Sequence, residues 1–138
     1  MRNTTLIDSG PLIALFDRSD NYHDKVLNFF KNYKGEFITT WAVVTEVTHM
    51  LDFNLKVQLD FLKWIELGAI KIYEIKQSDL KSIIPMIKRY TNVPMDFADS
   101  SLMFVAQKEG INTIVSIDSD FDIYRTLKSG YLKNLLSL

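Results

Sequence analysis

The sequence predicts an α/β fold with a central, mostly parallel sheet of about five strands and helices on both faces. Short stretches rich in β-branched residues alternate along the chain with longer stretches whose apolar residues recur every three or four positions. Such alternation is typical of strands joined by right-handed helical crossovers, which leave the strands parallel. The chain has 138 residues, 47% of them apolar, so we expect a single domain over residues 1–138.

The N-terminal half predicts two strands and several helical segments. Residues 4–8 form a short strand, after which Pro11 opens an apolar helical turn, because proline suits the first turn of a helix. We expect Asp20 or Asn21 to cap a helix over residues 22–33, which Gly35 ends. The elements expected next are a strand at 37–39 and helices at 40–52 and 55–67, the last of which ends at Gly68.

The C-terminal half continues this alternation. We expect a strand at 70–75 and then a helix at 78–89 that bends or starts late at Pro85. A helix over 94–109 ends at Gly110, and a buried strand follows at 112–117. An acidic loop then leads to a last strand near residues 131–138.

The composition excludes several classes of protein. Cysteine is absent, which excludes disulfides, thiolate zinc sites, iron–sulfur clusters and cysteine nucleophiles. No apolar run approaches the ~20 residues that span a bilayer, and the N-terminus lacks the apolar stretch of a signal peptide, so we expect a cytoplasmic protein without a membrane segment. The net charge of −1 does not by itself indicate a nucleic-acid binder.

Two aspartates come directly at the ends of predicted buried strands. Asp8 ends the strand at 4–8, and Asp118 follows the strand at 112–117. Ligands of open α/β sheets bind outside the carboxyl ends of the strands, so the two carboxylates face one crevice if their strands are neighbours. For either residue alone, capping of the next turn or helix is the more common role.

Three further acids lie on predicted helices. Asp96 and Asp99 are three residues apart in the first turns of the helix at 94–109, where they share a face and can also cap the helix or oppose its dipole. Glu46 borders the apolar stripe of the helix at 40–52, where a carboxylate is costly unless it is paired or bound to a cation. A surface salt bridge is the alternative for Glu46.

Other site classes fail on spacing. The run DSDFD at 118–122 begins like a calcium-binding EF-hand loop, but Ile123 and Ser129 stand where that loop needs glycine and glutamate. Glycine-rich phosphate loops are absent from the sequence. The segment DSG at 8–10 lacks the GxSxG pattern and the chain has only two histidines, which disfavours a Ser-His-Asp hydrolase.

The joint placement of the acids is stronger evidence than any one of them. Carboxylates that converge without an interleaved lysine or arginine repel one another, and their pKa values rise unless a divalent cation neutralises them. Oxygen ligands of this kind suit Mg²⁺ or Mn²⁺. Because such a cation activates water and stabilises the charge of a phosphoryl displacement, the sequence predicts phosphodiester hydrolysis.

Four stretches resemble the PIN-domain nucleases, and within that family the toxins of bacterial and archaeal VapBC toxin–antitoxin pairs. They are LIDSGPLIALFD, TTWAVVTEVTHML, PMDFADSSLMFVAQKEG and IVSIDSDFDIYR. The resemblance implies a PIN-like three-layer sandwich with a catalytic, metal-binding quartet. The quartet maps onto Asp8, Glu46, Asp99 and Asp118, with Asp96 as an additional acid and Asp120 as a rival for the last position.

The resemblance also implies an activity and partners. It implies a Mg²⁺- or Mn²⁺-dependent endoribonuclease, commonly a homodimer, that cuts structured RNA such as tRNA or ribosomal RNA. An antitoxin protein would silence it by inserting a peptide into the active-site groove. The family favours a hydroxyl residue at the position of Ser116, and we expect Ser9 and Ser116 to hold the carboxylates or water in place.

The rest of the surface offers contacts for these partners. Without the four quartet acids the net charge of −1 becomes +3, which favours contact with an RNA backbone. Apolar side chains on the helices at 22–33 and 55–67 are expected to flank the antitoxin, unless all of them belong to the core. The candidate phosphate contacts are Arg2, Arg18, Lys88, Arg89, Arg125 and Lys128.

Two alternatives remain open at this point. A receiver-type regulatory domain also clusters aspartates around Mg²⁺, but it needs a lysine at the end of a late strand, and here acids lie on helices at positions 46 and 99. A PIN-fold RNA-processing or RNA-binding protein that is not a toxin is the second alternative. Toxicity depends on the target RNA and on the neighbouring gene, so the sequence leaves this alternative open.

Overall fold

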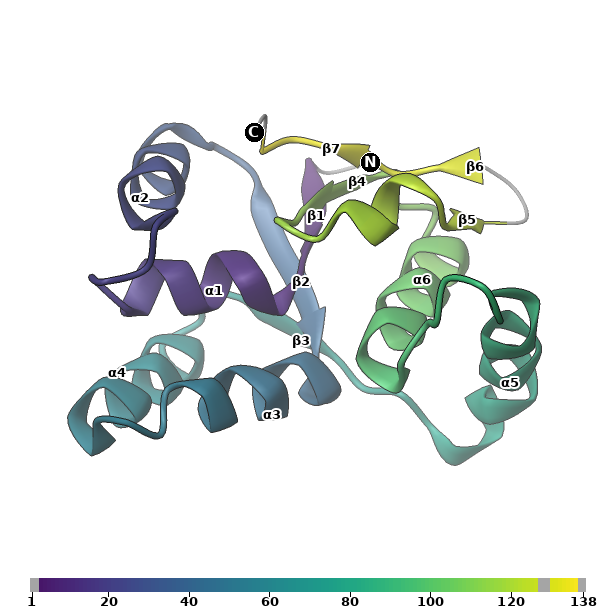
Figure 1. Ribbon diagram of the computed structural model, residues 1–138, viewed down its shortest axis with the longest axis horizontal. Coiled ribbons are helices and arrows are strands. Elements are labelled where there is room, and N and C mark those ends of the chain that lie inside the picture. The colour runs from purple at the N-terminus through teal and green to yellow at the C-terminus, as the bar shows by residue number, and fades with distance from the viewer. Residues whose placement is uncertain (1–2, 127–129, 137–138) are drawn as a thin grey trace.

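The computed structural model of the chain describes residues 3–126 and 130–136. Helices and strands alternate along these residues (Figure 1). No helix in the described ranges has the length and apolar character needed to cross a membrane. In chain order the elements are β1 (Thr4–Ile7), α1 (Ser9–Phe16), α2 (His23–Asn32), β2 (Glu36–Thr40), α3 (Trp41–Met50), α4 (Leu55–Glu66), β3 (Lys71–Tyr73), the 3₁₀ turn η1 (Gln77–Asp79), α5 (Leu80–Arg89), α6 (Phe97–Glu109), β4 (Thr113–Val115), the 3₁₀ turn η2 (Ser119–Asp122), β5 (Arg125–Thr126), β6 (Gly130–Tyr131) and β7 (Lys133–Asn134).

Five of the strands form one sheet in the order β3-β2-β1-β4-β7, and every neighbouring pair in it is parallel. The short strands β5 and β6 form a separate antiparallel pair. In Figure 1, α1 and α2 lie on one side of the central strands, and α5 and α6 lie on the other. The predicted α/β fold, a parallel sheet of about five strands between two layers of helices, is confirmed.

Most differences from the prediction lie at the ends of elements. The helix expected from residue 94 begins at Phe97, because Asp96 serves as its N-cap. Pro85 lies inside α5 and does not delay its start. The helix expected over residues 22–33 runs from His23 to Asn32. The last predicted strand is two short strands, β6 and β7, and residues 137–138 of that prediction fall outside the described residues.

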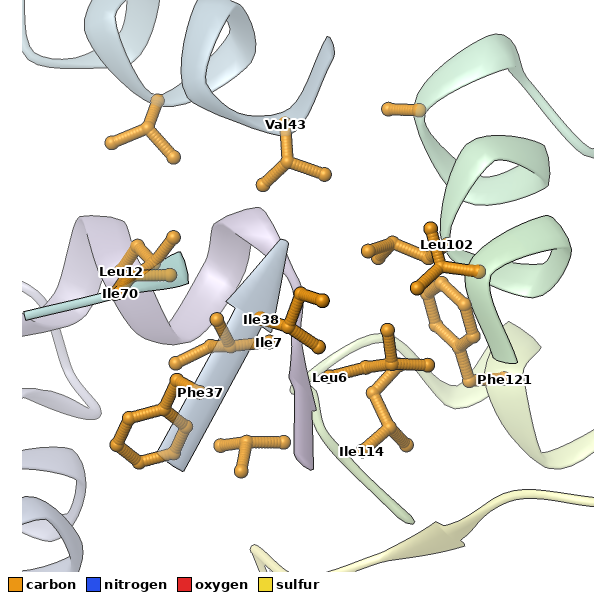
Figure 2. Packing of buried hydrophobic residues seen from close by; sticks show 14 of the residues in the cluster. Leu6, Ile7, Leu12, Phe37, Ile38, Val43, Ile70, Leu102, Ile114 and Phe121 are labelled. Atoms are coloured by element: carbon orange, nitrogen blue, oxygen red, sulfur yellow. The ribbon is translucent and has the colours of Figure 1, made fainter. Parts of the chain in front are cut away.

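The core forms because successive residues of a strand point to opposite faces of the sheet. The register places Leu6 beside Ile38 and Ile114, and Figure 2 shows these three side chains on the face toward α6. Ile7 and Phe37 lie on the opposite face, on the side of α1 and α2. All five side chains are buried, so packing from both sides fixes the central strands and the positions of their carboxyl ends.

Buried hydroxyl groups join the sheet to α6. The hydroxyl of Ser101 donates to the carbonyl of Ala98, so Thr40 donates to Oγ of Ser101, at 2.7 Å. Thr39 donates through its Oγ1 to the carbonyl of Ile7 at 2.8 Å. These bonds tie the first turns of α6 and the end of β1 to the end of β2. They thereby hold the two backbone segments that carry Asp8, after β1, and Asp99, in the first turn of α6.

The side chain of Asn134 extends the sheet beyond the last backbone pair between β4 and β7. Its Nδ2 donates to the carbonyl of Ser116 at 2.8 Å, and its Oδ1 accepts from the backbone N–H groups of Ser116 and Leu136. The amide therefore satisfies both backbone polar groups of the buried residue Ser116, just past β4. This contact fixes the backbone at Ser116, two residues before Asp118.

We expect Asn134→Ala to lower the free energy of unfolding by about 1 to 3 kcal/mol, because the peptide groups of Ser116 lose their partner inside the protein. Urea unfolding followed by circular dichroism measures the change. Asn32→Ala is the matched control, since the amide of Asn32 bonds to Asn28 on the exposed side of α2. The Asn32→Ala control should change the free energy of unfolding by less than about 0.5 kcal/mol. Equal losses of unfolding free energy in the two variants would contradict the role given to Asn134.

Candidate metal centre

Three carboxylates from separate elements meet at one edge of the sheet. Asp8 follows β1, Asp118 lies three residues after β4, and Asp99 lies in the first turn of α6. Because β1 and β4 are parallel neighbours in which Ile7 pairs with Val115, Asp8 and Asp118 leave the sheet at the same edge. One carboxylate oxygen from each aspartate lies within 4.8 Å of the other two.

Asp8 is the buried member of this group, with 4% of its surface exposed. Its N–H donates to the carbonyl of Val115 at 3.1 Å, and its Oδ2 accepts from the hydroxyl of Ser116 at 3.2 Å. Burial raises its pKa from 3.8 to about 7, and the charges of Glu46 and Asp118 add to the rise. Hydrogen bonds from the Ser9 backbone and the Ser116 side chain oppose it.

The hydroxyl of Ser116 links Asp8 to Asp118. It donates to Asp8 and accepts from the backbone N–H of Asp118 at 3.0 Å. Asp118 is more exposed than Asp8, and its Oδ1 accepts from the N–H of Asp120 at 2.9 Å, which caps η2. One buried hydroxyl therefore contacts both the side chain of Asp8 and the backbone of Asp118.

Asp99 and Asp96 divide the roles that the sequence left open for them. Oδ1 of Asp96 accepts from the N–H of Asp99 at 2.8 Å, so Asp96 is the N-cap of α6. Asp99 points into the site, and burial together with the charges of Asp96, Asp8 and Asp118 raises its pKa to about 7. A hydrogen bond from Tyr124 lowers the pKa of Asp99 and so opposes this rise.

The three acids open into a hollow of about 280 Å³. Glu46 and Asp96 line it but lie outside the group of three close oxygens, and Asp120 belongs to neither set. Among the described residues that line it, none is a lysine or arginine. The lining residues are Asp8, Ser9, Gly10, Glu46, Asp96, Asp99, Ile117 and Asp118.

Three residues that support the site were not expected from the sequence. Asn134 and Tyr124 act through hydrogen bonds between segments that no local pattern connects. Gly10 could have been noticed in the sequence, because a glycine two residues after an aspartate at the end of a strand indicates a close approach of the backbone to another segment. A Cβ at Gly10 would lie 3.3 Å from Cβ of Ile117, so the absence of a side chain there lets α1 begin close to the loop that carries Asp118.

The donor set fits a divalent cation. All its atoms are carboxylate oxygens, which Mg²⁺ and Mn²⁺ prefer. Two of the acids have pKa values near 7 because their charges are buried and mutually repulsive. A cation bound between them would relieve both effects, and metal binding would then release protons.

The chain was compared with known proteins. Residues 5–127 match the PIN domain family, and no curated protein matches the chain. Among solved structures, it is similar to VapC20 of Mycobacterium tuberculosis, described as a sarcin–ricin loop cleaving toxin, with a TM-score of 0.79, 16% identity and coverage of 91% of this chain and 98% of that one. It is also similar to VapBC2 of Rickettsia felis, solved with a DNA fragment from its promoter, with a TM-score of 0.61, 13% identity and coverage of 88% and 92%.

Without metal, the protein should lose stability as pH rises from 3.8 to about 7, the range between the ordinary and the raised pKa of Asp8 and Asp99. The folded state binds more protons than the unfolded state in this range, so folding is favoured at low pH. Because Asp99 is partly exposed and solvent screens its charge, most of the change comes from Asp8, and we expect a loss on the order of 4 kcal/mol in urea unfolding with EDTA. Asp8→Asn should reduce this dependence, and an unchanged slope in that variant would contradict the assignment.

Proposed function

This chain belongs to the PIN domain family, and on that basis we propose that it is a Mg²⁺- or Mn²⁺-dependent endoribonuclease and the toxin of a toxin–antitoxin pair. The observation that carries the proposal is the group of three carboxylate oxygens, from Asp8, Asp99 and Asp118, within 4.8 Å of one another. A receiver-type regulatory role is disfavoured, because family membership points to nuclease chemistry.

In this proposal, Asp8, Asp99 and Asp118 hold the cation. When bound, the cation lowers the pKa of a water molecule and stabilises negative charge on the scissile phosphate. Ser116 keeps Asp8 and the backbone of Asp118 in register through its hydroxyl, and Ser9 supports Asp8 through its backbone N–H. The carboxylate of Glu46, which lines the same hollow outside the group of three, accepts the proton that the attacking water loses.

RNA is the substrate class that fits this site best. The similar structure of VapC20 is of a toxin described as cleaving the sarcin–ricin loop, and we propose a loop of ribosomal RNA or tRNA as the target here. Arg18, Lys88 and Arg89 remain candidates for backbone contacts, whereas Arg2 and Lys128 lie outside the described residues. Arg125 is engaged elsewhere, because its guanidinium donates to the carbonyls of residues 122–124 and stacks 3.4 Å from the centre of the Tyr131 ring.

The surfaces expected to meet an antitoxin differ between the two helices. On α2, Phe29 and Phe30 pack against the core, and the ring of Phe30 stacks on that of Phe37 with centroids 4.8 Å apart. For α2 we therefore favour the alternative that its aromatic side chains belong to the core and do not contact an antitoxin. On α4, Leu55 and Leu59 are exposed at 66% and 53%, and other residues of the same helix line a groove of about 750 Å³ together with residues of α1 and α2. We propose that the antitoxin covers α4 and carries an arginine or lysine into the acidic hollow.

A second exposed apolar surface suits the expected homodimer. Trp41 and Phe97, at the starts of α3 and α6, border one hollow with Leu80 of α5. Ile84, one turn further along α5, is 49% exposed. We propose that a second copy of the chain covers this surface, which we define by Trp41, Leu80, Ile84 and Phe97. A non-toxin RNA-processing protein would use the same catalytic site and dimer but would have no antitoxin partner.

We expect the purified protein to cleave ribosomal RNA or tRNA in Mg²⁺ or Mn²⁺ and to lose this activity in EDTA. Asp8→Asn and Asp99→Asn should each lower the rate by at least about 100-fold while the protein stays folded, because each removes a ligand charge and little volume. Gel analysis of end-labelled RNA measures the rate. Undiminished cleavage in excess EDTA would contradict the metal mechanism.

Asp122→Asn is the matched control for these variants. Asp122 is exposed, ends η2 and lies outside the hollow, so the substitution should leave the cleavage rate unchanged.

Asp99→Asn should unfold at or above the unfolding temperature of the metal-free wild type, and its unfolding temperature should respond little to Mg²⁺. A ligand stabilises a protein that binds it by about 2.7 kcal/mol at a hundred times its dissociation constant. A lower unfolding temperature, or a full response to Mg²⁺, would make Asp99 a structural residue.

Two substitutions should separate the two partner surfaces. Leu59→Asp on α4 should prevent a complex with the protein encoded immediately upstream and leave the homodimer intact. Ile84→Asp on α5 should prevent the homodimer and leave that complex intact. Each substitution would bury a charge in only one of the two interfaces. Co-expression followed by size-exclusion chromatography measures both. Separate peaks for the wild-type chain and the upstream protein at micromolar concentration would contradict the antitoxin proposal.

A further inference from the structure

Tyr124 is a buried tyrosine whose hydroxyl reaches the acidic site. Its side chain is fully buried, and its hydroxyl lies 3.3 Å from Oδ2 of Asp99 and 3.1 Å from the carbonyl of Pro94. The hydroxyl has one proton to donate, and an ionised carboxylate is a stronger acceptor than a carbonyl. Ionised Asp99 is therefore the preferred acceptor.

The ring of Tyr124 is held on two sides. The rings of Phe121 and Tyr90 pack edge to face against it, with centroids 5.3 Å and 5.0 Å away. These contacts leave a bulky buried ring little room to change its rotamer. The oxygen of Tyr124 is consequently a fixed point against which the carboxylate of Asp99 can be oriented.

The backbone of Tyr124 is tied to the turn that carries Asp118. The N–H of Tyr124 donates to the carbonyl of Asp120 at 3.2 Å, and the N–H of Asp120 donates to Oδ1 of Asp118 at 2.9 Å. Tyr124 thus belongs to the same short unit as Asp118, while its hydroxyl bonds to Asp99 on α6. One residue connects two acids that are 19 positions apart in the sequence.

We propose that Tyr124 is a positioning residue that fixes Asp99 relative to Asp118, so that the two carboxylates can share one divalent cation. This inference rests on the proposed function, because it concerns the same metal centre. Tyr124 touches neither the cation nor the RNA in this account. It acts by orienting one ligand, as outer hydrogen-bond partners of metal ligands do.

Tyr124 is the donor in its contact with Asp99, because a phenol has one proton to donate and a carboxylate oxygen accepts. Removal of that hydroxyl would leave the carboxylate with the repulsion of Asp96, Asp8 and Asp118 and without this opposing hydrogen bond.

Tyr124→Phe tests the proposal, with Tyr90→Phe as its matched control. Both remove one phenol oxygen from the same aromatic cluster, but the hydroxyl of Tyr90 accepts from the backbone N–H of Arg125 at 2.8 Å. Titration calorimetry with Mn²⁺ should show that Tyr124→Phe weakens binding by about 10- to 100-fold, whereas Tyr90→Phe leaves the affinity at the wild-type value. Cleavage by Tyr124→Phe should recover at saturating Mn²⁺, because the tyrosine does not touch the reacting atoms.

Two results would overturn the positioning role. One is an unchanged Mn²⁺ affinity in Tyr124→Phe, and the other is an equal loss of affinity in Tyr124→Phe and Tyr90→Phe, which would reflect general loosening of the aromatic cluster. A failure of the proposed function would look different, because the wild-type chain itself would then fail to bind Mn²⁺.

Discussion

The parallel pairing of β1 with β4 is the constraint on which the rest of the structure depends. Ile7 pairs with Val115, and the N–H of Asp8 continues the ladder to the carbonyl of Val115. Since the two strands are neighbours and run in the same direction, Asp8 and Asp118 emerge at the same edge. Packing of α6 against the end of β2 then adds Asp99, so three acids from distant parts of the chain meet at one point.

This meeting of acids costs the fold stability in the absence of a cation. A buried carboxylate normally has a cationic partner, yet no lysine or arginine is among the described residues lining the hollow. The pKa values of Asp8 and Asp99, both raised to about 7, reflect this unbalanced charge. Strongly shifted pKa values in a hollow are typical of functional sites, and a divalent cation is the partner that the oxygen donors favour.

The sequence predicted the order of elements and the parallel sheet, because apolar periodicity is local and crossover connections follow general rules. It also indicated the strand-end acids. It did not indicate that the strands of Asp8 and Asp118 are neighbours, since the order of strands in a sheet is set by long-range packing. Tyr124 and Asn134 were missed for the same reason, because each acts on a segment that only the folded chain brings close. For the helix at 22–33 the sequence left open whether side chains such as Phe29 belong to the surface or to the core, because helical periodicity does not show which face meets a neighbour.

The central claim is that Asp8, Asp99 and Asp118 hold a common divalent cation. Crystals of the protein grown with Mn²⁺ and measured above the manganese absorption edge test it most directly, since the anomalous signal locates the metal independently of any assumed ligand. The account predicts an anomalous peak in the hollow, in contact with carboxylate oxygens of all three aspartates. A peak centred on Asp120 or Asp122, or an empty hollow at saturating Mn²⁺, would contradict it.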